Sequence, residues 1–158
     1  MKLVVGLGSP FLSDDGVGPR VVRELERQGC PGVGLIVSHA GGLSLIEQLE
    51  GTERAVIVDA LVDRRRRPGE VLTTHLEAAT RNASCSHDCS LAEALAVGRA
   101  LGMNLPPDEA IHLVAIVAGD VTTFGERLTQ PVAEAVERAC LAIRAIIDEK
   151  TPPTRVRS

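Results

Sequence analysis

Aromatic residues and cysteines are both scarce in this chain of 158 residues. It contains two Phe and neither Trp nor Tyr, so the protein will absorb little light near 280 nm. Its four cysteines are too few for the disulfide framework of a small secreted protein. We therefore expect Cys30, Cys85, Cys89 and Cys140 to be reduced thiols.

The chain also lacks an excess of basic residues and a long apolar run. Its net charge is −4 and its isoelectric point is near 5.6, which makes nucleic acid and anionic membrane surfaces poor candidates as partners. Every apolar run is shorter than the roughly 20 residues that a membrane span needs, and the N-terminus has no signal-peptide pattern. We expect a soluble, cytoplasmic, monomeric protein.

The hydrophobic residues that are present, 44% of the chain, are enough to bury a core in one domain. We expect a single domain over residues 1–150 and a flexible tail over residues 151–158. Runs of β-branched residues alternate with amphipathic Ala/Leu/Glu-rich stretches, which is typical of an α/β protein with a parallel sheet. The predicted strands are Leu3–Leu7, Gly34–Ser38, Ala55–Leu61, Glu70–Thr74 and Ile111–Ala118, and the predicted helices are Asp15–Gln28, Leu43–Leu49, Ser90–Leu101 and Pro131–Glu149.

The loop after the first strand, GLGSPFLSDDGVG, resembles a dinucleotide fingerprint but departs from it. The third glycine of that fingerprint, which lets the helix approach the strand, is replaced by Phe11. Asp14 and Asp15 stand where a pyrophosphate would meet the helix, and two carboxylates there suit a cation or a helix cap. If Asp14 serves as an N-cap, Asp15 is left to point elsewhere.

A third carboxylate, Asp59, closes the apolar strand AVIVDAL. Open α/β sheets bind their ligands at the carboxyl ends of the strands, which favours a functional role, although loop amides could also satisfy this side chain. His87 lies in a segment that follows the fourth predicted strand, and we expect it to reach the same edge of the sheet. Asp15, Asp59 and His87 together suit a borderline divalent metal such as nickel, zinc or iron.

Other residues allow alternative interpretations. Cys85, His87 and Cys89 could form a thiolate zinc site, although their spacing is compact. His39 follows the second predicted strand and could line the crevice, whereas His75 and His112 are better explained as structural residues. The run Arg64–Arg67 is expected in a solvated loop, or against an acidic surface of a protein partner.

Three motifs in order along the chain, GLGSPFLSDDGVG, VIVDAL and the histidine segment before a helix, together resemble the hydrogenase maturation endopeptidases. The resemblance extends from Met1 to about Lys150. The chain departs from the family's pattern by having Ser9 in place of asparagine, Asp15 where glutamate is frequent, and SHAGGL, residues 38–43, in place of an acidic turn with glycine and threonine.

This resemblance implies a fold and a function. The implied fold is a single three-layer αβα domain with a mostly parallel, twisted sheet of about five strands and helices on both faces. The implied function is removal of the C-terminal peptide from the large-subunit precursor of a nickel–iron hydrogenase, with substrate-bound nickel as the recognition signal. Residue by residue, the implied nickel ligands and catalytic residues are Asp15, Asp59 and His87.

Two alternatives to this function stay open on the sequence alone. One is a nickel-binding or assembly chaperone on the same fold without hydrolytic activity. The other is a nucleotide-binding α/β domain, which the broken glycine pattern and the paired aspartates disfavour. Since no serine lies in a nucleophile-elbow motif, we expect hydrolysis by a metal-activated water with Asp15 or Asp59 accepting a proton, and no covalent intermediate.

Overall fold

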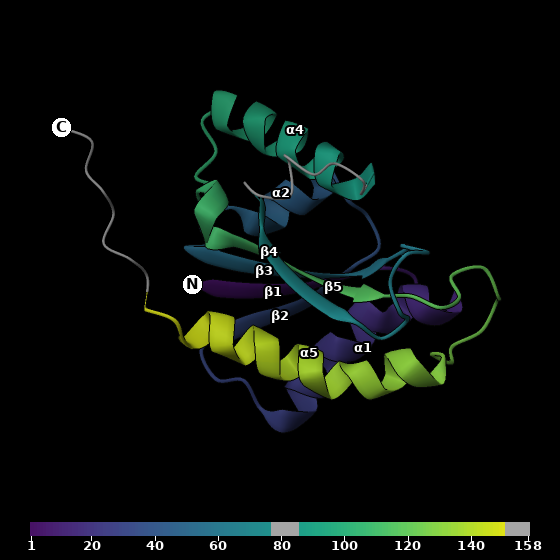
Figure 1. The fold of residues 1–158 in the computed structure, drawn as a ribbon. Coiled ribbons are helices and arrows are strands. Elements are labelled where there is room, and N and C mark those ends of the chain that lie inside the picture. The colour runs from purple at the N-terminus through teal and green to yellow at the C-terminus, as the bar shows by residue number, and fades with distance from the viewer. Residues whose placement is uncertain (77–85, 151–158) are drawn as a thin grey trace.

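A computed structural model describes residues 1–76 and 86–150, with the backbone alone for residues 86–90. Its five strands form one sheet in the order β2-β1-β3-β5-β4 (Figure 1). All neighbouring strands are parallel except β4, which runs antiparallel to β5. The strands are β1 (Lys2–Leu7), β2 (Val33–Ser38), β3 (Arg54–Leu61), β4 (Val71–His75) and β5 (Ile111–Val117).

Helices cover both faces of this sheet, which confirms the predicted three-layer α/β fold. In Figure 1, α1 and α5 lie on one face and α2 and α4 on the other. Two short 3-10 helices, η1 and η3, precede α1 and β5. The bounds are η1 (Ser13–Gly16), α1 (Val17–Gln28), α2 (Leu43–Leu49), α4 (Ser86–Ala100), η3 (Asp108–Ala110) and α5 (Gln130–Asp148).

The interior strands β1, β3 and β5 are mostly apolar because both of their faces are buried. Successive side chains of a strand point to opposite faces, so β3 sends Val56 and Val58 toward α1 and α5, and Ala55 and Ile57 toward α2 and α4. The sheet therefore separates two hydrophobic cores. Ile143 of α5 lies in the first core and is fully buried.

Three predicted boundaries or directions need correction. The first helix does not begin at Asp15, because residues 13–16 form the 3-10 turn η1 and α1 starts at Val17. Helix α4 begins at Ser86 instead of the predicted Ser90, so the backbone of His87 is helical. Strand β4 pairs antiparallel with β5, which places His75 opposite His112. The carboxyl end of β4 therefore lies beside the amino-terminal ends of the other strands.

No helix of the described residues is both long and apolar enough to cross a membrane. The predicted tail, residues 151–158, lies outside the described residues. The arginine run lies in the connection between β3 and β4, and its four side chains are exposed as predicted.

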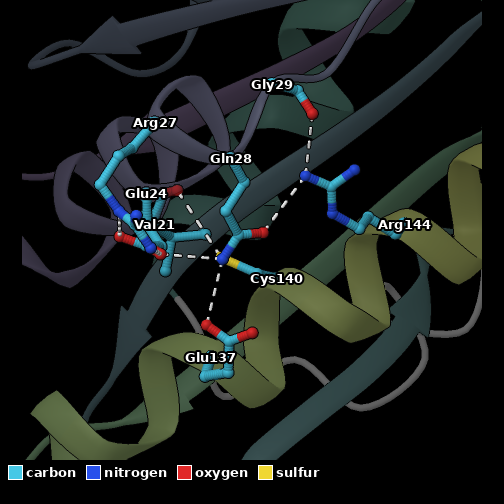
Figure 2. A network of polar contacts seen from close by, with 8 residues as sticks. All are labelled: Val21, Glu24, Arg27, Gln28, Gly29, Glu137, Cys140 and Arg144. Atoms are coloured by element: carbon cyan, nitrogen blue, oxygen red, sulfur yellow. Dashed lines mark hydrogen bonds and ion pairs between the residues drawn. The ribbon is translucent and has the colours of Figure 1, made fainter.

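A polar network joins α1 to α5 at the surface of the first core (Figure 2). The side-chain amide of Gln28 donates to Glu24 at 2.8 Å and to Glu137 at 3.1 Å, and its oxygen accepts from Arg144 at 3.2 Å. Beneath this network, Cys140 is fully buried in the core. Burial, with the nearby carboxylates of Glu137 and Glu24, raises the pKa of the Cys140 thiol to about 11.

We predict that Cys140 is inert in the folded protein. Near pH 8 its thiol is overwhelmingly protonated and lies out of contact with solvent, whereas Cys30 is partly exposed. Brief treatment of the native protein with iodoacetamide, followed by peptide mass mapping, should modify Cys30 and leave Cys140 unmodified until denaturant is added. Rapid modification of Cys140 without denaturant would contradict this packing.

Two glycines allow α1 to pack directly on the strands. A Cβ atom on Gly18 would lie 2.3 Å from the carbonyl oxygen of Leu7 and 2.7 Å from that of Val58, and a Cβ on Gly6 would lie 2.4 Å from the carbonyl oxygen of Gly18. The backbones of β1, β3 and α1 thus meet without intervening side chains. This close approach holds η1 and the first turn of α1 against the end of the sheet.

We predict that Gly18→Ala destabilises the protein by about 2 kcal/mol, because the added methyl group must displace backbone atoms. Urea unfolding followed by far-ultraviolet circular dichroism measures this change without aromatic chromophores. Gly125→Ala is the matched control, since a Cβ there meets nothing within 4 Å. Equal stability of the two variants would show that the close contact at Gly18 is unimportant.

Candidate functional site

A cavity of about 140 Å³ opens at the carboxyl ends of the parallel strands. The connection after β1 leads to β2 at one side of the strand order, whereas the connection after β3 leads to β4 at the other side. Such a switch point leaves a crevice in which open α/β sheets bind ligands. The cavity is lined by Leu7, Gly8, Ser9, Asp15, Ser38, His39, Ala40, Gly41 and Asp59.

Asp15 reaches this cavity from η1. Its Oδ2 atom accepts a hydrogen bond from the backbone N–H of Ser9 at 2.8 Å. Gly8 makes the arrangement possible, because a Cβ at that position would lie 1.9 Å from the carbonyl oxygen of Asp15, and its φ of +131° favours glycine. The loop after β1 therefore holds the Asp15 carboxylate at the cavity wall, as the sequence predicted.

Asp59 enters the same cavity from β3, close to the carboxyl end of that strand. Its Oδ1 atom accepts a hydrogen bond from the backbone N–H of Ala60 at 2.8 Å. A backbone amide thus satisfies part of this carboxylate, as the alternative interpretation expected, yet the side chain also faces the cavity. The structure brings Asp15 and Asp59 to one site from two separate strand ends.

His39 contributes an imidazole to the cavity lining, which confirms the expectation that it lines the crevice. Its Nδ1 atom lies 2.9 Å from the carbonyl oxygen of Gly8. A carbonyl can only accept, so Nδ1 carries the hydrogen in this contact. Gly8 therefore orients His39 through its carbonyl group, while the next residue, Ser9, donates to Asp15.

Asp14 has a different role from its neighbour. Its side chain is 0% exposed and accepts hydrogen bonds from the backbone N–H groups of Gly119 (2.8 Å), Asp120 (2.9 Å) and Thr129 (2.7 Å), and from the Thr129 hydroxyl (2.7 Å). These donors satisfy a charge whose burial would otherwise be costly. The sequence suggested that Asp14 caps α1. It does not, because its carboxylate binds the loop between β5 and α5 instead.

His87 lies in the first turn of α4, and its side chain is outside the described part of the structure. The connection from β4 does not explain its position, because β4 ends at the opposite edge. The direction of α4 explains the position of His87. This helix leads back toward the start of β5, so it begins near the carboxyl end of β5 (Figure 1). The backbone of His87 therefore lies at the same edge as the cavity, and its role as a ligand stays a prediction.

Within the described residues, no three His, Cys, Asp or Glu side chains are grouped so as to hold a metal ion. Cys85 and the side chains of His87 and Cys89 fall outside that part of the chain, so the alternative zinc site stays a prediction. The rings of His75 and His112, with centroids 4.4 Å apart, lie near the start of β5, at the end of the sheet opposite to the cavity. Burial, with His75 and Arg54 nearby, lowers the pKa of His112.

Two features of the site were not predicted from the sequence. The partners of Asp14 lie more than 100 residues away in the chain, so local sequence carries no signal for them. Ser38 also lines the cavity, and its hydroxyl donates to the carbonyl oxygen of Ala40 at 2.8 Å. Its place at the end of a parallel strand was the available signal.

Comparison with known proteins agrees with this fold. A family model described as hydrogenase maturation protease matches residues 19–146, and the chain belongs to this family. The match includes Asp59 and His87, and Asp15 precedes it.

Two curated relatives carry corresponding names. Over 105 residues, 63% of this chain and 64% of the relative, the sequence is 30% identical to the hydrogenase 2 maturation protease of Escherichia coli K12. The chain thus spans slightly less than two thirds of that relative's length. It is also 28% identical over 150 residues to the hydrogenase expression/formation protein HupD of Bradyrhizobium diazoefficiens, covering 87% of this chain and 75% of HupD.

Solved structures show the same architecture. The hydrogenase maturating endopeptidase HybD from Escherichia coli superposes with a TM-score of 0.74 at 25% identity, covering 92% of this chain and 91% of HybD. The nickel–iron hydrogenase maturation protease HybD from Thermococcus kodakarensis gives a TM-score of 0.73 at 27% identity, covering 92% and 97% of the two chains.

We predict that the two adjacent aspartates contribute very differently to the stability of the fold. Asp14→Asn should destabilise the fold by about 3 kcal/mol, since an amide group would face buried N–H donors. Asp15→Asn should change the free energy of unfolding by less than about 1 kcal/mol, because Asp15 accepts one backbone bond at a partly open site. Urea unfolding by circular dichroism measures both, and equal losses would contradict this division of roles.

Proposed function

We propose that this chain is an endopeptidase that removes the C-terminal extension of the nickel-loaded large-subunit precursor of a nickel–iron hydrogenase. The observation that carries the proposal is the pair of carboxylates, Asp15 and Asp59, in one cavity at the switch point of the sheet. Membership of the hydrogenase maturation protease family supplies the reaction class and the type of substrate.

Nickel is part of the substrate in this proposal, and the precursor brings it to the cavity. Asp15 and Asp59 offer carboxylate oxygens there, and His87 would add an imidazole from the start of α4. Carboxylate and imidazole groups are ligands that suit nickel, and a precursor would fill the remaining coordination positions with its own side chains. Binding through the substrate's metal would restrict the enzyme to precursors that already contain it.

The peptide bond is hydrolysed by water in this scheme. Two serines line the cavity, but the Ser38 hydroxyl donates to the Ala40 carbonyl oxygen, and Ser9 accepts from the Phe11 N–H at 3.4 Å through its Oγ atom. Neither contact resembles the base that activates a nucleophilic serine. A bound metal polarises a carbonyl group or acidifies a water molecule, and Asp15 or Asp59 would accept the proton.

The setting proposed for this activity is the cytoplasm, with the protein acting as a monomer on a folded protein substrate. The acidic net charge of −4 supports a protein partner in preference to nucleic acid. The exposed Arg64–Arg67 run is available to an acidic surface on the precursor, where it would speed encounter more than it would strengthen binding.

Intact-mass measurement of the nickel-loaded precursor, incubated with wild-type protein or with single variants, tests the proposal. Wild type should remove one discrete C-terminal peptide. Asp15→Asn, Asp59→Asn and His87→Gln should each slow its release at least 100-fold, because each removes a group that acts on the metal or on the proton. Asp148→Asn, at an exposed position at the end of α5, is the control and should process normally.

Two other outcomes would overturn parts of this proposal. If all three variants process the precursor at the wild-type rate, these residues are neither ligands nor catalysts. If wild type binds the nickel-loaded precursor stably and leaves its mass unchanged, the protein is a nickel-binding or assembly chaperone on the same fold.

A further inference from the structure

The two phenylalanines of this chain both lie on its surface, against each other. Phe11 is 51% exposed and Phe124 is 83% exposed, and their rings stack with centroids 6.5 Å apart and planes inclined by 15°. Aromatic side chains usually lie in protein cores because they bury a large apolar area. We call these two residues the phenylalanine pair.

The phenylalanine pair is part of the same loop system as the cavity. Phe11 lies between Ser9, which lines the cavity, and Asp15, which projects into it. The carbonyl oxygen of Phe11 accepts from the N–H of Gly125 at 2.8 Å, and the N–H of Ser13 donates back to the carbonyl oxygen of Gly125 at 2.9 Å. A short backbone pairing therefore fixes Phe124 beside Phe11 and both beside the site.

Hydrogen bonds also hold the loop that carries Phe124. The Oδ1 atom of Asp120 accepts from the backbone N–H groups of Thr122 (2.9 Å) and Thr123 (3.0 Å). A hydrogen bond from the Thr123 side chain, together with these two backbone bonds, lowers the pKa of the Asp120 carboxyl to about 2. Phe124 is thus presented on a tied loop, and ordering it on binding costs little additional entropy.

Further exposed apolar residues occur at the same edge of the sheet. Leu43 opens α2 two residues after Gly41, which lines the cavity, and Val62 directly follows β3. Because β1, β2, β3 and β5 are parallel, the loops that follow them meet at one edge. Apolar side chains therefore follow all four of these strands at the edge where the cavity opens.

We propose that the phenylalanine pair is the docking surface for an apolar stretch of the precursor next to its cleavage site. This inference rests on the proposed endopeptidase function. The occupant follows from continuity with the site: a chain whose scissile bond lies in a cavity of about 140 Å³ must extend over its border, and Phe11 is four residues from Asp15. A second copy of this protein on the same surface would crowd the approach to the cavity.

Fluorine nuclear magnetic resonance can observe this surface alone. Protein labelled with 4-fluorophenylalanine should give two signals, since the chain has two Phe and both are in the pair. Addition of unlabelled nickel-loaded precursor should shift or broaden both signals, and serum albumin should affect neither. Unchanged signals while the precursor is being processed would overturn the inference. Signals that change with the protein's own concentration, without precursor, would assign the surface to a second copy and also overturn it.

Kinetic variants give an independent test. Phe124→Ser should raise KM for the precursor about 10-fold or more and change kcat less than about 3-fold, because it removes docking contacts and leaves the reacting groups in place. Leu141→Ser on α5, at a site 60% exposed, is the matched control and should leave both constants unchanged. If wild type cleaves the precursor and Phe124→Ser matches it in KM, docking at the pair is wrong while the proposed function stands. If wild type does not cleave, the proposed function fails first.

Discussion

The buried carboxylate of Asp14 is the interaction on which the site depends. It joins η1, just before α1, to the loop between β5 and α5, through bonds to Gly119, Asp120 and Thr129. A fully buried charge is tolerated because N–H and O–H donors surround it, and these donors belong to a segment distant in sequence. The same hydrogen bonds of Asp14 fix the direction of Asp15 and bring Phe124 against Phe11. Loss of this carboxylate would therefore disturb both the cavity and the surface beside it.

Topology explains why two carboxylates meet in one cavity. Asp15 follows β1 and Asp59 lies near the end of β3, and the connections after these adjacent parallel strands lead to opposite sides of the strand order, to β2 and to β4. The contact between Gly18 and the ends of β1 and β3 lets α1 start directly against the sheet, which holds η1 close to the ends of these strands. Two neighbouring aspartates consequently face in different directions: Asp14 turns toward a loop and holds it, while Asp15 faces the cavity. Their identical chemistry gives no indication of this difference.

The sequence predicted the strands well and the long-range contacts poorly. Local apolar runs determine strand positions, and all five observed strands lie within one or two residues of the predicted bounds. The direction of β4 depends on its pairing of His75 with His112, which no local pattern encodes. The 3-10 turn at residues 13–16 likewise involves distant partners, since the N–H groups of Ser13 and Asp14 donate to the carbonyl oxygens of Gly125 and Asp120. Asp15, Asp59 and His39 were found because they follow parallel strands, whereas the role of Asp14 depends on partners more than 100 residues away.

The central claim is that this edge of the sheet recognises a substrate through the metal that the substrate carries. The most direct test compares the intact mass of one precursor in its nickel-loaded and nickel-free forms, before and after incubation with the wild-type protein. We predict that a single C-terminal peptide is lost from the nickel-loaded form and that the nickel-free form keeps its full mass. Equal cleavage of both forms would contradict recognition through nickel.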